Sequence, residues 1–459
     1  MKAYLFPFVA LGAAAALTAA PPPLPQIRSG SVVMTQDRTS RQVRISYTLD
    51  NAPAVVTVDI LTNGVSIGHG NLAGITGEIN KIVQPGAQTL KWRPDRSWPD
   101  QCIPACGIEA VVTAWPTNAP PDYMVIDLTG GPNSTTPAAE KIRYYTCEAA
   151  LPFPGGVTND LCKTDYLVMR KIHAAGKTFR MGITEAEKNG ATINNAAPHY
   201  VQLTNDYYIG VYEFTQRQWD HLAVKLSRPS YFTNNWQRRP VECTGGTYVR
   251  GYSDQAKYKV WPINGHAVNE NGPDGKTGLY QLRRIVGGLL IDLPTEAQWE
   301  FAARSGKGGI MPDGSSLFVK TEMVKYGRFP GSPDLPTGIT VNRDTPPENG
   351  GTSIVGSYPP NAWGLYDMMG NVRELCLDAW KASYDQTVTH IDPAGMTAAI
   401  KSAEGAIKKE HAVRGGHWGA VYSIASRASY NINWTGTGTY ADSTEYSHAT
   451  GFRVCLTLP

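Results

Sequence analysis

The cysteines are the first residues of this chain that could do chemistry. There are seven, together with nine histidines. Cys102 and Cys106 are near neighbours, as are Cys147 and Cys162, and each pair could close a local disulfide loop. An odd count leaves at least one thiol unpaired. The sequence has no Cys-x-x-Cys pair and no His-Glu-x-x-His motif, so it does not indicate a zinc site.

A second set of chemically able residues follows residue 416. His417 stands beside Trp418, and Asp442, Glu445 and His448 lie downstream. These residue types can carry out acid–base catalysis. No regular spacing ties them together, however, and scattered polar surface groups are the favoured interpretation.

The same region is rich in aromatic residues. Between residues 420 and 450 they alternate with Ser, Thr, Asn, Gly and Ala, and few charges occur: Tyr422, Tyr430, Trp434, Tyr440 and Tyr446. Aromatic anchors among small polar residues are typical of recognition surfaces. The alternative is that these rings pack beneath long loops, since tyrosine is intermediate in burial. The sequence leaves both interpretations open.

The elements that must position these residues fall into two parts. Residues 27–130 read as all-β, because Val43, Ile45, Tyr47 and Leu49 alternate with polar residues. Asn63-Gly64 predicts a tight hairpin turn, and further strands are expected at 89–92, 110–115 and 123–128. An immunoglobulin-like or fibronectin type III-like sandwich is predicted, in which we find no chemistry.

Residues 131–175 are predicted to be a linker or connector, because Gly, Pro, Asn, Ser and Thr dominate their beginning. From 176 to 459 a mixed α and β domain with long loops is expected. Thr215-Gln-Arg-Gln218 and Thr295-Glu-Ala-Gln298 are capping-box patterns that predict two helices.

Composition and the N-terminus set the broad class. With 459 residues, 42% hydrophobic, the chain should bury the cores of two or three domains. A net charge of +3 without a basic stripe gives no indication of a nucleic-acid partner. Residues 1–20 read as a signal peptide: Lys2, an apolar run at 9–17, then Thr18-Ala19-Ala20.

We therefore expect a secreted, periplasmic or cell-surface protein whose mature chain begins near Pro21. A retained N-terminal anchor is the alternative, although the apolar run is short for a membrane span. No later segment reaches 18 apolar residues, so no transmembrane segment is expected in the mature chain.

Five ordered segments, closed by a sixth, stand out between residues 178 and 453. They are Thr178-Phe-Arg-Met-Gly182, Tyr208-Ile-Gly-Val-Tyr-Glu-Phe-Thr215, Leu293-Pro-Thr-Glu-Ala-Gln-Trp-Glu-Phe-Ala-Ala-Arg304, Gly364-Leu-Tyr-Asp-Met-Met-Gly-Asn-Val-Arg-Glu374, Arg414-Gly-Gly-His-Trp418 and Gly451-Phe-Arg453. Together they resemble the formylglycine-generating enzyme (sulfatase-modifying factor) family. One such segment is weak evidence, whereas the ordered set is specific. The resemblance implies an α+β fold, a variant of the C-type lectin fold, behind the all-β sandwich.

The family's founding activity oxidises a sulfatase cysteine to formylglycine with oxygen and with copper held by two thiolates. Soft thiolates select Cu(I), and in the enzymes both lie in the loop after a Gly-Gly-Ser motif. Here no cysteine occurs from Leu377 to Val454, His417 replaces the motif's serine, and Arg373 stands where the enzymes carry tryptophan. Copper is therefore not expected, and the oxidase activity is not predicted.

The resemblance also implies calcium. The family's second calcium site corresponds here to Asp367, Gly370, Val372 and Glu374. Two carboxylates and two backbone carbonyls form the oxygen set that Ca²⁺ prefers. The alternative is a turn in which Asp367 caps backbone amides and Glu374 pairs with a buried arginine.

The family's catalytic groove corresponds to Arg373, His417, Trp418 and Tyr422, and loss of the thiolate loop is expected to leave a depression there. With Tyr430 and Trp434, these residues form the predicted ligand site, which suits a sugar or a peptide. We predict a secreted, non-catalytic protein that binds a glycan, peptide or surface protein. The alternatives are an enzyme of the same family, acting at the same groove, and a structural surface-layer subunit.

Overall fold

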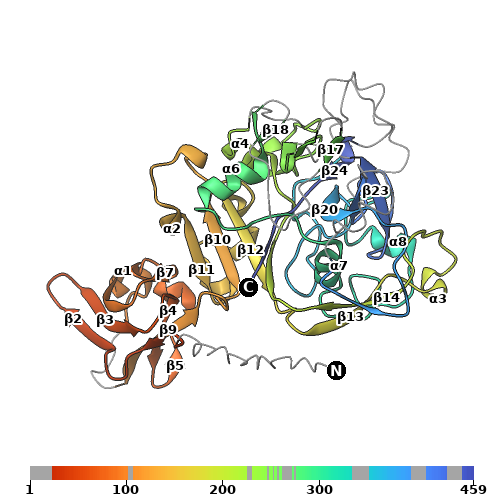
Figure 1. The fold of residues 1–459 in the computed structure, drawn as a ribbon. Helices are drawn as coiled ribbons and strands as arrows, with labels where there is room; N and C mark the ends of the chain where they lie inside the picture. The colour runs from red at the N-terminus through yellow and green to blue at the C-terminus, as the bar shows by residue number, and fades with distance from the viewer. Residues whose placement is uncertain are drawn as a thin grey trace, which may run out of the picture.

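The computed structural model describes residues 23–101, 107–224, 230–244, 248–251, 253–255, 258–260, 271–272, 275–332, 351–393, 410–431 and 447–459. These residues form an N-terminal β-sandwich and a larger mixed α+β part (Figure 1). Among these residues, none of the helices combines the length and the hydrophobicity that a membrane-spanning segment needs.

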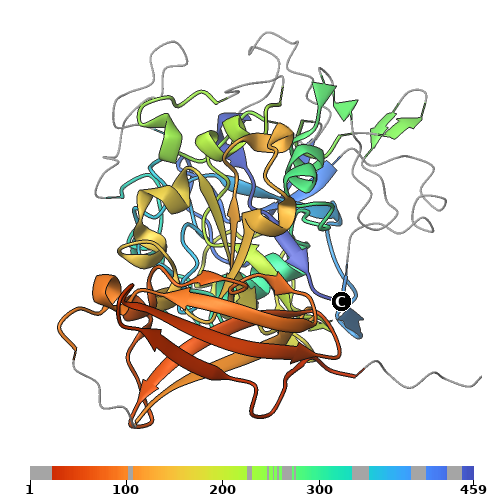
Figure 2. The same cartoon turned by 90° about the vertical axis from the view of Figure 1, so that its left-hand side faces the viewer.

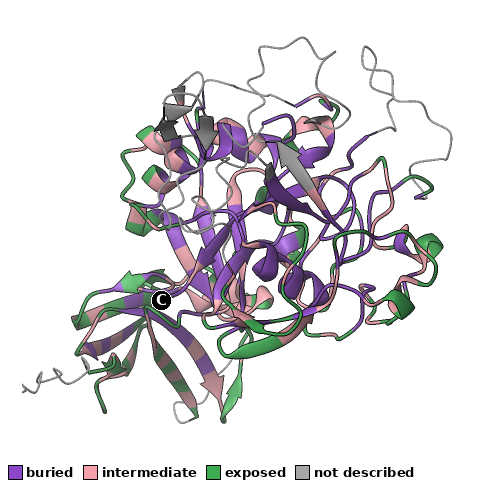
Figure 3. Ribbon diagram, turned by 45° about the vertical axis from the view of Figure 1, so that its right-hand side comes forward, coloured by how far each residue is buried: buried purple, intermediate pink, exposed green. Residues whose placement is uncertain are grey.

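The sandwich consists of two antiparallel sheets that enclose one core (Figure 2). Ile45, Tyr47, Val56, Ile60 and Leu90 are buried between them. In β3, buried residues alternate with more exposed ones, as expected, and Figure 3 shows this change of burial along the strands of the sandwich. One sheet holds β1 (Gln26–Ile27), β2 (Val33–Asp37), β3 (Gln42–Asp50), β6 (Thr76–Gly77) and β8 (Gly86–Trp92), and the other β4 (Ala54–Thr62), β5 (Val65–Ser66), β7 (Ile82–Val83) and β9 (Ile108–Pro116).

The hairpin predicted at Asn63-Gly64 is confirmed. It joins β4 to β5, and both turn residues have positive φ angles, 50° and 78°. This is the backbone conformation of a two-residue hairpin turn that matches the right-handed twist of the flanking strands.

A five-stranded antiparallel sheet stands between the sandwich and the rest of the chain (Figure 1). It corrects two predictions. The strand expected at 123–128 does not belong to the sandwich but is β10 of this sheet, and the supposed connector 131–175 contributes β11 and β12. Residues 123–126 are all buried, because β10 has apolar clusters on both faces. The strand order is β11 (Ile142–Tyr145), β10 (Tyr123–Asp127), β12 (Tyr166–Ile172), β15 (Tyr207–Gly210) and β25 (Cys455–Thr457).

Four smaller sheets complete the described strands. The four-stranded one carries the candidate site and has the order β23 (Arg427–Asn431), β22 (Glu410–Arg414), β20 (Arg373–Ala379) and β24 (Thr450–Gly451). A second contains β13 (Lys177–Met181), β14 (His199–Leu203) and β21 (Thr389–Ile391). Two hairpins pair β16 (Ser253–Gln255) with β17 (Tyr258–Val260) and β18 (Asn271–Gly272) with β19 (Gly275–Lys276).

Both predicted capping boxes are confirmed. Thr215 and Gln218 cap the start of α4, and Thr295 and Gln298 cap the start of α7. Every residue of α7 is buried, so this helix lies in the core against β13, β20 and β22 (Figure 3). The described helices are α1 (Pro94–Ser97), α2 (Ala138–Lys141), α3 (Glu185–Lys188), α4 (Gln216–His221), α6 (Gly278–Ile285), α7 (Glu296–Arg304) and α8 (Lys320–Met323).

Candidate functional site

The candidate site begins where β22 ends, at Gly415 and Gly416. Both have positive φ angles, 87° and 72°, which glycine adopts without strain. A Cβ atom on Gly416 would lie 2.5 Å from Cδ2 of Tyr422. The chain therefore folds tightly back on itself here, and only glycine allows Tyr422 to pack so closely.

Buried ion pairs fix this turn to the core. Arg414 at the end of β22 contacts Glu296 and Glu300 of α7. Burial alone would raise the pKa of Glu300, but Arg304 and Arg414 lower it to about 2. On the next strand, Arg427 Nη2 lies 2.7 Å from Glu296 Oε2. The loop between residues 414 and 427 is thus anchored to α7 at both ends.

His417 is buried inside this loop, with 1% of its surface exposed. Its Nδ1 accepts a hydrogen bond of 3.0 Å from the Gly419 amide, and the Ala420 amide donates to its carbonyl. Burial, reinforced by Arg373 and His448, lowers the pKa of His417 to about 3. His417 is therefore a neutral residue that shapes the turn, and the described structure does not present it to a ligand.

Trp418 is half-buried and belongs to an aromatic cluster that we define as Tyr231, Phe232, Trp418 and His448. Its ring centroid lies 5.5 Å from that of Phe232 and 5.6 Å from that of His448. The Trp418 backbone amide donates to the carbonyl of Asn371, 2.9 Å away. Segments distant in sequence thus hold the indole in place while leaving part of it exposed.

Arg373 and Tyr422 flank the turn and are also half-buried. Arg373 Nε donates to Thr450 Oγ1 across 2.8 Å, and β20 and β24 pair in parallel at this point. The cavity lined by Arg373, His417 and Tyr422 measures about 20 Å³, which is room for about one water molecule. Among the described residues the expected depression is therefore filled, chiefly because His417 and Tyr422 turn inward.

The remaining predicted ligand residues are placed only in part. Tyr430 lies on β23, paired with His411 on β22, and its side chain is outside the described structure. Trp434, Asp442 and Glu445 also lie outside the described residues. Of the predicted set, the structure brings together Arg373, His417, Trp418 and Tyr422.

Glu242 is a site residue that the sequence did not reveal. Its carboxylate is fully buried, and Oε1 accepts hydrogen bonds from the amides of Tyr231 and Phe232, at 2.7 and 3.0 Å. Burial raises the pKa of Glu242 to about 7, against the opposing effects of Cys243, these amides and Arg239. It therefore supports the backbone of the aromatic cluster. No sequence motif identifies this glutamate, because the amides that it binds, those of Tyr231 and Phe232, belong to a different segment of the chain.

In the segment predicted to bind calcium, Asp367 caps a backbone amide and Glu374 pairs with a buried arginine, as the alternative interpretation expected. Asp367 Oδ2 accepts from the Gly356 amide at 2.6 Å, while Glu374 accepts from Arg453 and from Trp299 Nε1. Both oxygens of Glu374 are therefore bound by protein donors. The amide of Gly370 donates to the Gly415 carbonyl, and that of Val372 to Glu213.

Glu213 is a third buried carboxylate in this region, and it too was missed. It lies in the recognised segment at 208–215 and accepts from Asn371 Nδ2 at 2.6 Å. Burial and the neighbouring Asp367 raise its pKa well above the ordinary value, and burial raises the pKa of Asp367 to about 6. Oδ1 of Asp367 has no hydrogen-bond partner in the described structure.

These contacts do not form a calcium site as they stand. The described residues contain no cluster of three or more His, Cys, Asp or Glu arranged to hold a metal ion. Arg453 and Trp299 both donate hydrogen bonds to the Glu374 carboxylate, so a cation that binds this carboxylate would have to displace one of these donors. Calcium at Asp367, Gly370, Val372 and Glu374 stays a prediction.

Cys147 and Cys162 are free thiols in the structure, so the suggested disulfide between them is wrong. Cys162 is buried in an apolar cluster, with its sulfur 3.6 Å from the carbonyl of Gly156. Cys376 and Cys455 are also buried, and burial raises the pKa of both thiols above the ordinary value. Such thiols are poor sources of thiolate. Cys102 and Cys106 lie outside the described residues.

Comparison with known proteins identifies the family to which the larger part of the chain belongs. The model of the sulfatase-modifying factor enzyme 1-like domain matches residues 163–458. The chain belongs to this family of formylglycine-generating-enzyme-like proteins, as the motifs predicted, and the α+β assignment is confirmed. The match begins before the predicted boundary at 176, in agreement with the placement of β12 in the larger part.

The relatives include active, inactive and differently named proteins. The chain is 37% identical to the formylglycine-generating enzyme of Thermomonospora curvata over 110 residues, 22% of this chain and 33% of the relative. It is 40% identical to the inactive C-alpha-formylglycine-generating enzyme 2 of Mus musculus over 110 residues, 24% and 29% of the two chains. It is 32% identical to the chaperone protein LppX of Paenibacillus barcinonensis over 194 residues, 38% and 62%. The chain thus spans less than two thirds of each relative.

Two solved structures align over a larger share of both chains. PvdO from Pseudomonas aeruginosa aligns with a TM-score of 0.43 and 21% identity over 64% of this chain and 95% of that chain. The Treponema denticola variable protein 1 aligns with a TM-score of 0.40 and 21% identity over 64% and 96%.

Proposed function

We propose that this protein is an exported, non-catalytic binding protein that recognises its ligand at the surface formed by Arg373, Trp418 and Tyr422. One observation carries the proposal. The loop that holds the copper thiolates in the oxidases holds aromatic side chains here, and buried ion pairs keep that loop in place.

The absence of thiols from this loop argues against oxidation. Cu(I) requires soft ligands, and residues 377–454 contain no cysteine. His417 does not replace a thiolate, because its Nδ1 already accepts a backbone hydrogen bond. The scaffold remains while the groups that perform the chemistry are missing.

The ligand would contact the rim of the loop, because the cavity beneath it is nearly full. A half-exposed indole and phenol offer flat faces for stacking, and Arg373 adds a donor and a positive charge. These groups suit a glycan, a peptide or a loop of a surface protein. Because Trp418 is already packed against Phe232 and His448, it would lose little conformational freedom on binding.

The names of two relatives support a role without oxidation. One is called an inactive formylglycine-generating enzyme, and another is called a chaperone protein. Export is proposed on the N-terminal sequence, whose charged start, apolar run and small residues are typical of a signal peptide.

A screen on glycan and peptide arrays tests the proposal, with wild type compared with Trp418→Ala. Tyr200→Ala is the matched control, because Tyr200 is an exposed aromatic residue on β14, outside the loop. We expect binding to wild type and to Tyr200→Ala, and a loss of at least about tenfold in Trp418→Ala. Hits that bind Trp418→Ala equally well, or an absence of hits, would overturn the proposal.

A further inference from the structure

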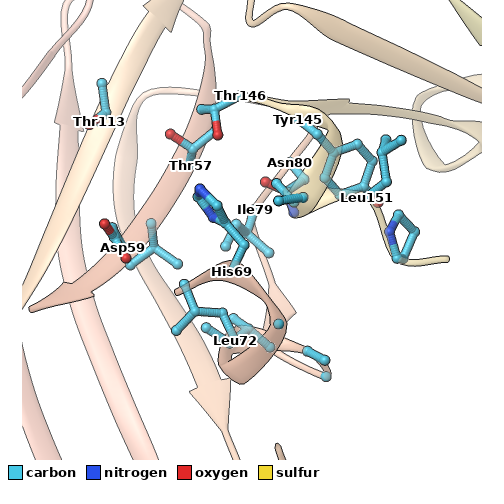
Figure 4. A pocket seen from close by; sticks show the side chains of 18 of the residues that line it. Thr57, Asp59, His69, Leu72, Ile79, Asn80, Thr113, Tyr145, Thr146 and Leu151 are labelled. Atoms are coloured by element: carbon cyan, nitrogen blue, oxygen red, sulfur yellow. The ribbon is translucent and has the colours of Figure 1, made fainter. Parts of the chain in front are cut away.

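A pocket of about 720 Å³ lies where the sandwich meets residues 145–154 of the larger part (Figure 4). Its volume falls in the range of ligand sites, and such sites favour domain interfaces. The outer face of β4 and β9 forms one wall, and residues 69–80 form another. The pocket is remote in sequence from the loop at 414–427.

The free edge of β4 opens into this pocket at Val58. β9 pairs with one edge of β4 along its whole length, whereas β7 pairs with the other edge only at Ala54 and Val55, and β5 only at Leu61 and Thr62. On this second edge, Val56 bonds to Asn80 and Lys81, and the Ile60 carbonyl accepts from the Ile67 amide.

Val58 has the same orientation as Val56 and Ile60, because alternate residues of an antiparallel strand direct their amide and carbonyl to the same edge. Within the described part of the chain, no residue hydrogen-bonds to the Val58 amide or carbonyl. Val58 is 9% exposed, and an unpaired backbone group at such a position costs free energy. The Val58 amide and carbonyl therefore offer the pocket one donor and one acceptor, oriented as at the edge of a β-sheet.

The other lining groups define the charge of a ligand. Asp59 is the acid of the described lining, and its Oδ1 accepts from Ile60 and Ser66. No Lys or Arg occurs in that described lining. His69 reaches into the pocket beside Thr57 and Asp59 (Figure 4). This environment disfavours phosphates and carboxylates and suits a neutral or cationic ligand.

The pocket also offers apolar surface for side chains. Trp115 is half-buried, and its indole donates to Thr57 Oγ1 at 2.9 Å, which fixes the ring at the wall. Val111 is 40% exposed, and Leu151 and Ile79 add apolar contacts from other elements. Polar backbone groups at one edge with apolar walls around them are the features that strand-adding peptide sites use.

We propose that this pocket binds a short, extended, neutral or cationic peptide segment that pairs with Val58 as an added strand. One peptide residue donates its amide to the Val58 carbonyl and accepts from the Val58 amide, and its neighbours lie against Trp115 and His69. This site is distinct from the surface at Trp418 and does not depend on it.

A pool of capped tetrapeptides built from uncharged and basic residues provides the probe. The pool is passed over the immobilised full chain, bound members are identified by mass spectrometry, and the most enriched member is measured by calorimetry. Thr113→Trp fills the pocket from the exposed face of β9. Glu109→Trp is the matched control, because it lies four residues away on the same exposed face of that strand and outside the lining.

We expect the enriched peptide to bind wild type, Glu109→Trp and Trp418→Ala alike, and to bind Thr113→Trp at least about tenfold more weakly. Replacing one peptide amide by an ester, which removes the N–H with little change in shape, should also weaken binding about tenfold. An unenriched pool, equal binding to Thr113→Trp, or a series of esters that all bind like the parent would overturn the proposal. Loss of binding in Trp418→Ala would assign the peptide to the other site and likewise overturn it.

Discussion

Arg453 and Glu374 form a two-bonded ion pair in the core, with Arg453 Nε and Nη2 each 2.6 Å from a different carboxylate oxygen. Neither side chain is exposed. Trp299 Nε1 of α7 donates to the same carboxylate at 2.8 Å. The pair therefore joins β20, the C-terminal Gly-Phe-Arg segment and α7, which are distant in sequence and together carry the candidate site.

Removing Arg453 should strongly destabilise the protein. Arg453→Met leaves the Glu374 carboxylate buried without its counter-ion, next to Glu213 and Asp367. Breaking a buried pair in this way typically costs about 3–5 kcal/mol, measured as the free energy of unfolding in urea. Arg28→Met is the control, because Arg28 pairs with Asp50 at the surface and its loss should leave the urea midpoint unchanged. Equal midpoints for both variants would contradict this role of the pair.

Calcium should raise the melting temperature if Asp367 and Glu374 hold the ion, because a ligand that binds only the folded state stabilises it. The prediction is measured on metal-stripped protein with added calcium and then with chelator. Asp367→Asn tests the carboxylate whose Oδ1 lacks a partner in the described structure, and it should reduce the shift. Glu374→Ala should abolish it. A melting temperature that ignores calcium would show that the capped turn and ion pair are the whole role of this segment.

Glu242 should contribute a loss of stability as the pH rises from about 4.5 to about 7. Burial raises the pKa of Glu242 in the folded protein to about 7, so the folded state holds this proton more tightly than the unfolded chain does. The contribution of Glu242 to the free energy of unfolding therefore decreases across this window and levels off above it. A shift of this size corresponds to a cost on the order of 3 kcal/mol.

Glu242→Gln isolates this contribution, because the amide oxygen can still accept from Tyr231 and Phe232 while no proton is exchanged. The free energy of unfolding at pH 8, relative to that at pH 5, should be higher in this variant than in wild type. Glu185→Gln, at an exposed helix position, should retain the wild-type difference. If Glu242→Gln and wild type lose the same stability between the two pH values, the carboxyl does not titrate as stated.

Local patterns in the sequence were sufficient to predict the helices and the turn that the structure confirms. Thr295 and Gln298 satisfy each other's backbone amides within one helical turn, so the start of α7 is set by four consecutive residues. Asn63-Gly64 is equally local. The ordered motifs predicted the family, and they contain residues that contact one another in the core, such as Trp299, Glu374 and Arg453.

Pairing between distant segments could not be predicted in this way. The sequence of β10 does not show which sheet this strand joins. Its partners, β11 and β12, follow a stretch whose Gly, Pro and Ser are typical of a linker. The filled cavity at Tyr422 depends on how His417 turns inward, which follows from packing and not from residue type. Glu213 and Glu242 were missed for the same reason, since burial makes them notable and burial is a property of the whole fold.

The protein should not convert a sulfatase-motif peptide to the formylglycine product when incubated with copper and oxygen. Cys162, Cys376 and Cys455 are buried, and burial raises the pKa of each of these thiols. Mass spectrometry of the peptide detects the conversion, and the Thermomonospora curvata formylglycine-generating enzyme, named among the relatives, serves as the positive control.

Copper binding provides a second readout of the same prediction. A protein without a thiolate pair should compete weakly with a Cu(I) chelator, whereas the positive control should compete well. If the peptide cysteine is nevertheless oxidised, serine variants of each cysteine would identify the thiols responsible. Loss of that conversion in any one of them would overturn the non-catalytic assignment, because it would place the reaction on a cysteine of this chain.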